Sequence, residues 1–166
     1  PFRTKFEKDL ATFEGTSGIG CISDSDPQPL LVRSHLGVFA LTTCGVINNA
    51  DALIEEYFAD HGNQFMAMSS GKVNETELVA ALINQEDDFV SGIKHVQEKV
   101  EGSMTLLLMT EEGNIIAARD RLGRLPVLIG KNHEGYCASF ESFAYQKIDY
   151  ETVYELGPAE IMNITA

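Results

Sequence analysis

Thiols and imidazoles are the side chains of this sequence that could act as nucleophiles, bases or metal ligands. The cysteines, Cys21, Cys44 and Cys137, are odd in number and far apart, and none has CxxC spacing. We therefore interpret them as reduced thiols and predict neither a disulfide framework nor a metal centre. Cys44 has no His or Lys beside it in the sequence, which favours a small core residue over a nucleophile. The histidines share no ligand spacing and are interpreted as surface or capping residues: His35, His61, His95 and His133.

Two further segments have the composition of anion-binding sites. The stretch GTSGIGCISDSD, residues 15–26, is rich in glycine, but it has no lysine and no helix is predicted after it, so we expect a flexible loop. The stretch IIAARDRLGRLPVLIG, residues 115–130, contains three arginines between apolar runs, and its Gly123 and Pro126 are typical turn residues. It is predicted to be a hairpin, with Arg119 paired to a carboxylate inside it.

Composition excludes several classes of protein. The chain of 166 residues is 44% hydrophobic and 22% charged, which is typical of one globular domain. Its net charge of −13 disfavours nucleic acid and anionic membranes as partners. No apolar run approaches the roughly 18 residues of a membrane span, and the first residues lack the apolar region of a secretory signal. The cytoplasm is the expected location.

The elements that must position these residues follow from hydrophobic periodicity. Residues 34–47 are rich in β-branched and aromatic residues and predict one long strand or a strand pair. Three segments with helical spacing follow, over residues 50–61, 75–84 and about 87–101. Asn48 or Asn49 is expected to cap the first helix and Gly62 to end it.

After these helices the pattern changes to that of strands. Four short apolar runs separated by turn residues predict a four-stranded meander over residues 103–139. A short helix around residues 141–145 and a last strand at residues 159–165 complete the prediction. Strands, then helices, then more strands indicate an α+β fold with antiparallel sheets and helices packed outside.

Five separate blocks resemble, in order, the glutaminase domain of class II glutamine amidotransferases, and most closely its amidophosphoribosyltransferase branch. The blocks are DPQPLLV, FALTTCGVINNADAL, NETELVAALI, ARDRLGRLPVLIG and ELGPAEIMNI. The resemblance as a whole extends over roughly Gly18 to Thr165. The resemblance implies a four-layer αββα sandwich of the N-terminal nucleophile hydrolases, built from antiparallel sheets. It also implies a catalytic cysteine as the first residue of the mature chain. Because Pro1 is not that residue, we expect residues 1–166 to be one such domain that lacks its first strand or strands.

The resemblance also assigns positions in the glutaminase site. The family's oxyanion-binding Asn and Gly align with Cys44 and Gly45, and a thiol is a poor donor. The family's preceding His is Thr43 here. The Asp that holds the substrate ammonium group aligns with Glu75. The family's arginine clamp for the substrate carboxylate has no counterpart, because residues 15–24 contain no cation.

These departures favour a glutaminase-like domain of an amidophosphoribosyltransferase homologue with impaired glutamine hydrolysis. An active amidotransferase whose nucleophile precedes Pro1, and a non-enzymatic sensor or scaffold of the same fold, stay open as alternatives. The expected partners are glutamine, a C-terminal phosphoribosyltransferase-type domain and further copies of the full-length chain. No cofactor or iron–sulfur cluster is expected in this domain.

Overall fold

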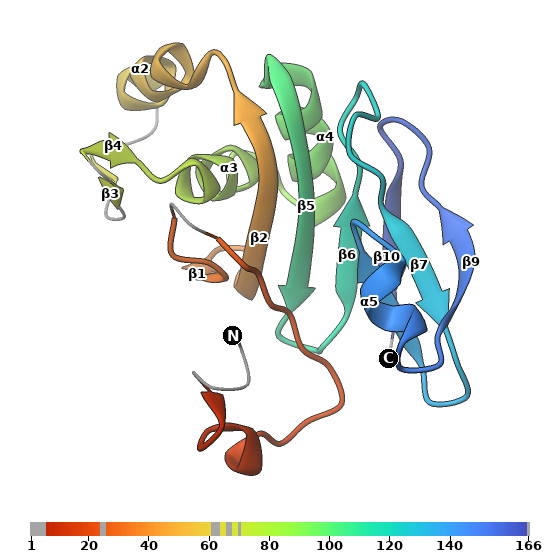
Figure 1. Ribbon diagram of the computed structural model, residues 1–166. Helices are drawn as coiled ribbons and strands as arrows, with labels where there is room; N and C mark the ends of the chain where they lie inside the picture. Colours follow the sequence, from red (N-terminus) through yellow and green to blue (C-terminus); the bar gives the residue numbers. More distant parts are fainter. Residues whose placement is uncertain (1–5, 24–25, 61–63, 66–67, 70, 166) are drawn as a thin grey trace.

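Two antiparallel sheets form the centre of the molecule (Figure 1). The structure is a computed structural model that describes residues 6–23, 26–60, 64–65, 68–69 and 71–165. The five-stranded sheet has the order β1 (Leu30–Ser34), β2 (Gly37–Ile47), β5 (Gly102–Thr110), β6 (Ile115–Ala118) and β10 (Ile161–Ile164). The three-stranded sheet has the order β8 (Tyr136–Ser139), β7 (Leu128–Lys131) and β9 (Glu151–Glu155). A small hairpin joins β3 (Met68–Ser69) to β4 (Lys72–Val73), and a 3-10 turn, η1, spans Leu10–Thr12.

The β2–β5 pair is the longest ladder, running from Phe39 opposite Thr110 to Ile47 opposite Gly102. Its two backbones approach very closely at one end. A Cβ atom on Gly45 would lie 1.9 Å from the carbonyl oxygen of Ser103, and any such atom must clash. Glycine is therefore required at position 45, near the end of β2.

Three helices cover one face of the five-stranded sheet: α2 (Ala50–Asp60), α3 (Glu75–Ile83) and α4 (Phe89–Lys99). The side chain of Asn74 caps α3 by accepting from Thr76 N, and that of Asp88 caps α4 by accepting from Val90 N, each at 2.8 Å. The larger hydrophobic core lies between these helices and the sheet and includes Phe39 and Leu78.

A smaller core joins the two sheets. Its fully buried members are Ala117, Val127, Ile129 and Leu156. The short helix α5 (Phe143–Gln146) lies against the three-stranded sheet, where the ring of Tyr145 comes within 3.1 Å of the place a Gly130 Cβ would occupy. Gly130 follows the inward-facing Ile129, so strand alternation puts α5 on the outer face of that sheet.

The predicted four-stranded meander is wrong. β5 and β6 pair in one sheet, and β7 and β8 pair in the other, so residues 119–127 form a crossover between sheets instead of a hairpin turn. The β-strand β9 was not predicted, because all of its residues are exposed and it has no alternating apolar pattern. The open choice at residues 34–47 resolves to a single strand, β2, preceded by β1 in a hairpin.

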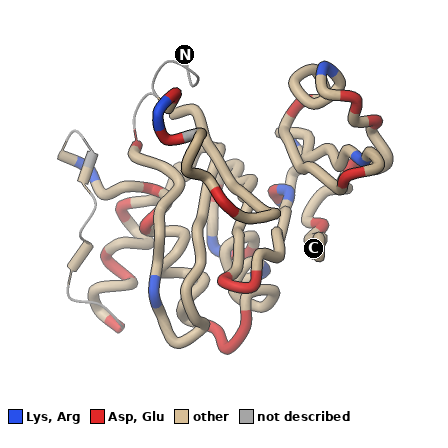
Figure 2. The backbone as a smooth tube through the Cα atoms, turned by 90° about the horizontal axis from the view of Figure 1, so that it is seen from below, with Lys and Arg blue, Asp and Glu red and all other residues tan. Residues whose placement is uncertain are grey.

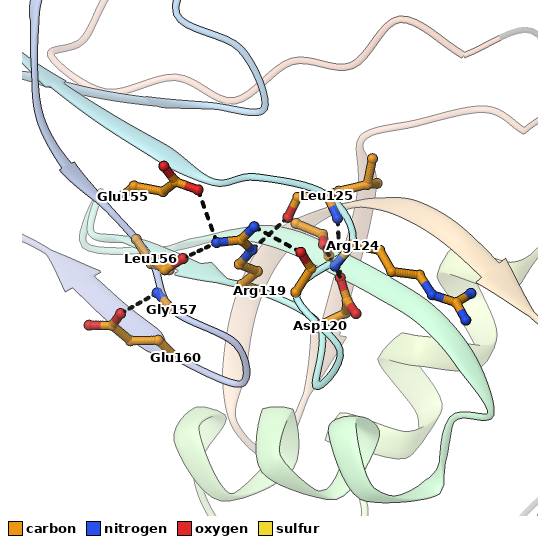
Figure 3. Close-up of polar contacts among 10 residues, drawn as sticks. Arg119, Asp120, Arg124, Leu125, Glu155, Leu156, Gly157 and Glu160 are labelled. Atoms are coloured by element: carbon orange, nitrogen blue, oxygen red, sulfur yellow. Dashed lines mark hydrogen bonds and ion pairs between the residues drawn. The ribbon is translucent and has the colours of Figure 1, made fainter.

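Arg119 holds the crossover together (Figure 3). Its Nε donates to Leu125 O and its Nη2 to Gly123 O, each at 2.8 Å, and its Nη1 donates to Leu156 O. The predicted carboxylate partner is Glu155 at 3.2 Å, which belongs to β9 and not to the predicted hairpin. The guanidinium group therefore links the crossover to the segment that follows β9, a geometry that its planar array of donors allows.

Asp120 organises the same crossover from the other side. It is 3% exposed, and its carboxylate accepts from the backbone N–H groups of Leu122 at 2.9 Å and Arg124 at 3.0 Å. Asp120 therefore fixes the turn that connects the two sheets.

The start of α2 also differs from the expectation. Asn49 O accepts the first helical hydrogen bond, from Leu53 N, but its side chain bonds Lys99 O and Glu101 N instead of capping the helix. The predicted C-terminal Gly62 lies outside the described residues.

Candidate functional site

The positions assigned by resemblance line one cavity of about 760 Å³. Cys44 and Gly45 reach it from the end of β2, and Glu75 reaches it from the first turn of α3. The other walls are formed by residues 20–23, 26 and 28 before β1, by residues 104 and 107 of β5, and by residues 138–141 and 144. The structure thus brings together all three site residues predicted from the sequence.

An open strand edge forms one side of this cavity. β1 pairs with β2 only as far as Leu41, so no strand of the described residues pairs with the β2 edge beyond it. Thr43 N donates to Gln28 Oε1 at 2.8 Å, and the N–H of Ile47 donates to the Glu75 carboxylate. Alternation along a strand directs the N–H of Gly45 to the same edge, between these two, and no described residue accepts from it. This free donor is one that could stabilise an oxyanion.

The interpretation of Cys44 as a core residue is wrong, because its side chain is exposed. Thr43, one residue earlier, is buried on the helix side of the sheet, where its hydroxyl lies 2.6 Å from that of Thr76. Alternation therefore places Cys44 on the opposite face, at the cavity.

Glu75 lies in an environment that disfavours its charge. Burial is the largest cause of its raised pKa, and repulsion by Asp26 adds to it. The hydrogen bond from Ile47 and the positive charge of Lys72 lower the pKa and offset part of that effect. A cationic group bound in the cavity would therefore stabilise the charged form of Glu75.

The cavity has no cation of its own among the described residues. Its wall contains the carboxylates of Asp26, Glu75 and Glu141, and none of its lining residues is Lys, Arg or His. The backbone tube shows the basic positions dispersed over the molecule instead of gathered at one place (Figure 2).

Two contributors to the cavity were missed from the sequence. The side chain of Gln28 accepts a hydrogen bond from the backbone at the open edge of β2. Cys21 adds a second thiol, and its pKa is raised mainly by burial and further by the nearby Cys44. Cys21 has no sequence signal, and Gln28 lies in the block DPQPLLV, for which the resemblance assigned no site role. Both roles depend on how the loop folds back over β2.

The other candidates lie away from the cavity. His35 Nε2 contacts Glu86 O at 2.9 Å, His95 Nε2 contacts Gln85 Oε1 at 2.9 Å, and His133 is exposed. His61 lies outside the described residues. In the part of the chain that the structure describes, no three His, Cys, Asp or Glu residues could hold a metal ion. No helix there has the length and apolarity to cross a membrane.

Comparisons with known proteins show the family to which this chain belongs. A family model described as a glutamine amidotransferase domain matches residues 17–144. The amidophosphoribosyltransferase of Methanocaldococcus jannaschii is 31% identical over 137 residues, which are 82% of this chain and 28% of the relative. That of Bacillus subtilis is 31% identical over 140 residues, again 82% of this chain and 28% of the relative.

A solved structure supports the same relationship. The glutamine phosphoribosylpyrophosphate (PRPP) amidotransferase from B. subtilis, complexed with ADP and GMP, matches with a TM-score of 0.72 and 28% identity. The match covers 83% of this chain and 30% of that chain, so this chain spans less than a third of the length of these relatives. Because the family model matches well over half of the chain, this chain belongs to the glutamine amidotransferases, as a class II domain that resembles the glutaminase domain of amidophosphoribosyltransferases.

Proposed function

We propose that this chain is the glutaminase-like domain of an amidophosphoribosyltransferase homologue in which glutamine hydrolysis is impaired. The observation that carries the proposal is the charge of the cavity. Glutamine brings both an ammonium group and a carboxylate, and the cavity offers carboxylates for the first and no cation for the second. An uncompensated carboxylate beside Asp26 and Glu75 would be repelled, which weakens productive binding of any α-amino acid.

Cys44 supports the same proposal. A side-chain amide at this position would donate to the oxyanion together with the Gly45 N–H, whereas a thiol donates weakly. Loss of one such donor costs about 10²–10³ in rate. The whole protein would then take nitrogen from free ammonia in making phosphoribosylamine from phosphoribosyl pyrophosphate, through a C-terminal phosphoribosyltransferase-type domain.

The fold proposal is the four-layer sandwich of the N-terminal nucleophile hydrolases. Helices α2 to α4, the five-stranded sheet, the three-stranded sheet and α5 correspond to the four layers, with α5 as a much reduced outer layer. A catalytic cysteine would have to come from outside residues 1–166.

One observation favours the alternative of an active amidotransferase. The Gly45 N–H is free and Glu75 faces the cavity, which supports a role for both in binding a substrate. The two proposals differ in whether glutamine is consumed.

The test uses the full-length gene product and compares glutamine with ammonium chloride as nitrogen donor for phosphoribosylamine formation. We expect turnover with ammonia, no measurable glutamate release from glutamine, and no adduct with a glutamine-like affinity label in intact-mass and peptide analysis. Label on an N-terminal cysteine, together with glutamate release, would instead establish the active alternative. If the folded protein makes phosphoribosylamine from neither donor, the enzymatic proposal is wrong and a scaffold role remains.

The variant Cys44→Asn makes this test more specific, because it introduces at the open strand edge the amide donor that the family has at this position. Cys137→Asn is the matched control, since Cys137 does not line the cavity. In an active amidotransferase only the first variant would raise glutamate release.

A further inference from the structure

Two thiols from distant parts of the chain lie on the wall of the same cavity. Cys44 is at the end of β2 and is exposed, and Cys21 is in the loop before β1 and is partly buried. Both are free thiols in the structure. Cys137, the third cysteine, does not line this cavity but lines an adjoining one of about 570 Å³, which shares Gly20, Leu107 and Ala138 with it.

The two thiols differ in how firmly they are held. Cys44 is opposite Thr105 in the nine-pair ladder between β2 and β5, so its position is fixed by the sheet. Cys21 follows Gly20 in a segment, residues 13–23, that has no helix or strand. A Cβ atom built on Gly18 or Gly20 would meet nothing within 4 Å, so the loop around Cys21 is loosely packed. A loop of this kind can adjust to the narrow geometry that a disulfide requires.

We propose that Cys21 and Cys44 form a reversible disulfide across the cavity, with a low-molecular-weight disulfide as the oxidant. In the first step the Cys44 thiolate attacks the oxidant, a mixed disulfide forms on Cys44, and one small thiol leaves. In the second step the Cys21 thiolate attacks the Cys44 sulfur, the protein disulfide forms, and the second small thiol leaves. Two protein thiols are oxidised, one small disulfide is reduced to two thiols, and the two protons go to the departing thiolates.

The order of the two steps follows from exposure. The oxidant reaches the exposed Cys44 first, whereas Cys21 is shielded and needs only to reach a sulfur in the same cavity. Burial, and the nearby Cys44, raise the pKa of Cys21 and reduce its thiolate fraction near neutral pH. The second step should therefore accelerate as pH rises toward that raised pKa.

The bond would fasten the loop over residues 20–23 to the end of β2. Since Gly45, the carrier of the free backbone donor, follows Cys44 directly, oxidation would obstruct the part of the cavity closest to it. This inference rests on the two thiols and the cavity and does not depend on whether glutamine is hydrolysed.

The test treats the folded full-length protein with oxidised glutathione at pH 7 and pH 9, quenches with acid, and maps tryptic peptides without reduction. Cleavage after Lys and Arg separates the three thiols of this domain into peptides 9–33, 34–72 and 132–147. We expect peptides 9–33 and 34–72 to be joined, faster at pH 9 than at pH 7, and to separate on reduction. Cys21→Ser and Cys44→Ser should abolish the joined species, and Cys137→Ser should leave it unchanged.

Cys21→Ser also tests the order of steps, because it should accumulate glutathione on Cys44. A stable glutathione adduct in the unsubstituted protein, with no joined peptides, would overturn the proposal. So would joined peptides that include 132–147 at comparable yield under native conditions, or no modification of either thiol. The same reaction in denaturant is the control for chance pairing, and thermal unfolding of each variant checks that it is folded.

Discussion

The carboxyl group of Glu75 is half-buried in the cavity, close enough to Asp26 for the two charges to repel. Burial and this repulsion raise its pKa in the folded protein above the value in the unfolded chain. The folded state therefore binds the proton more tightly, and its stability falls as pH rises above about 4 and through the raised pKa.

Replacing Glu75 with Gln removes this loss of stability at high pH, because the amide carries no charge. The amide oxygen still accepts a hydrogen bond from the Ile47 N–H. We expect Glu75→Gln to be more stable than the unsubstituted protein at pH 8, with a smaller difference at pH 5. Urea unfolding at both pH values measures this, with Glu98→Gln on the exposed side of α4 as the control. A variant that is less stable at pH 8 would show that the attraction of Lys72 outweighs burial.

Asp120 carries a second prediction about a single side chain. Asp120→Asn places an amide NH₂ among the backbone N–H donors of Leu122 and Arg124, so one buried acceptor is replaced by a donor. We expect the free energy of unfolding to fall by about 2–3 kcal/mol, because hydrogen bonds to charged groups typically contribute energies of this size. Chemical denaturation measures it, and Asp87→Asn, at an exposed position, should change little. Equal effects of the two substitutions would contradict the role assigned to Asp120.

Single residues also show what the sequence can and cannot indicate about the site. Cys44, Gly45 and Glu75 could be assigned because short blocks around them resemble the family, and the structure places them on one cavity. Their chemical roles remain predictions. Cys21 and Gln28 could not be assigned, because their contact with β2 depends on the path of a loop without periodic pattern.

Among the elements, α3 and α4 cross where α4 has a glycine. A Cβ atom on Gly92 would lie 2.5 Å from Ile83 O, a backbone atom that cannot move aside cheaply. We expect Gly92→Ala to destabilise the protein by about 1–3 kcal/mol despite the better helix propensity of alanine. Glu98→Ala, on the exposed side of the same helix, is the matched control in thermal and urea unfolding. A stabilised Gly92→Ala variant would mean that the helices can separate without cost.

Helices were more predictable than the order of strands. Asn74 and Asp88 cap α3 and α4 with local hydrogen bonds, so their starts are encoded within a few residues. The crossover after Ala118 was not predictable, because Gly123 and Pro126 suit a hairpin turn as well as a connection between sheets. Arg119 stabilises the connection between sheets through contacts with Glu155 and Leu156, which lie more than thirty positions away.

At the scale of the molecule, the two hydrophobic cores are unequal. The core between helices and sheet is large, whereas the core between the two sheets has four fully buried members, among them Leu156. Partial opening between the sheets should therefore cost less free energy than global unfolding.

Hydrogen exchange can test this inequality. Leu156→Ala should increase amide exchange chiefly in β7 and β9 and leave α3 and β5 protected, because it weakens only the smaller core. Leu78→Ala, in the larger core, should cost about 2–5 kcal/mol and increase exchange throughout. If Leu156→Ala increases exchange equally in both sheets, the two cores unfold as one unit.

The strand order has a consequence for the protein while it is being made. β6 is bordered in the finished sheet by β5 and β10, and β10 comes after all three strands of the other sheet. As the chain leaves the ribosome, β6 thus has one edge without a partner throughout the synthesis of β7, β8 and β9. During that interval the exposed edge is open to pairing with another nascent chain, and the arrival of Ile161–Ile164 ends the exposure.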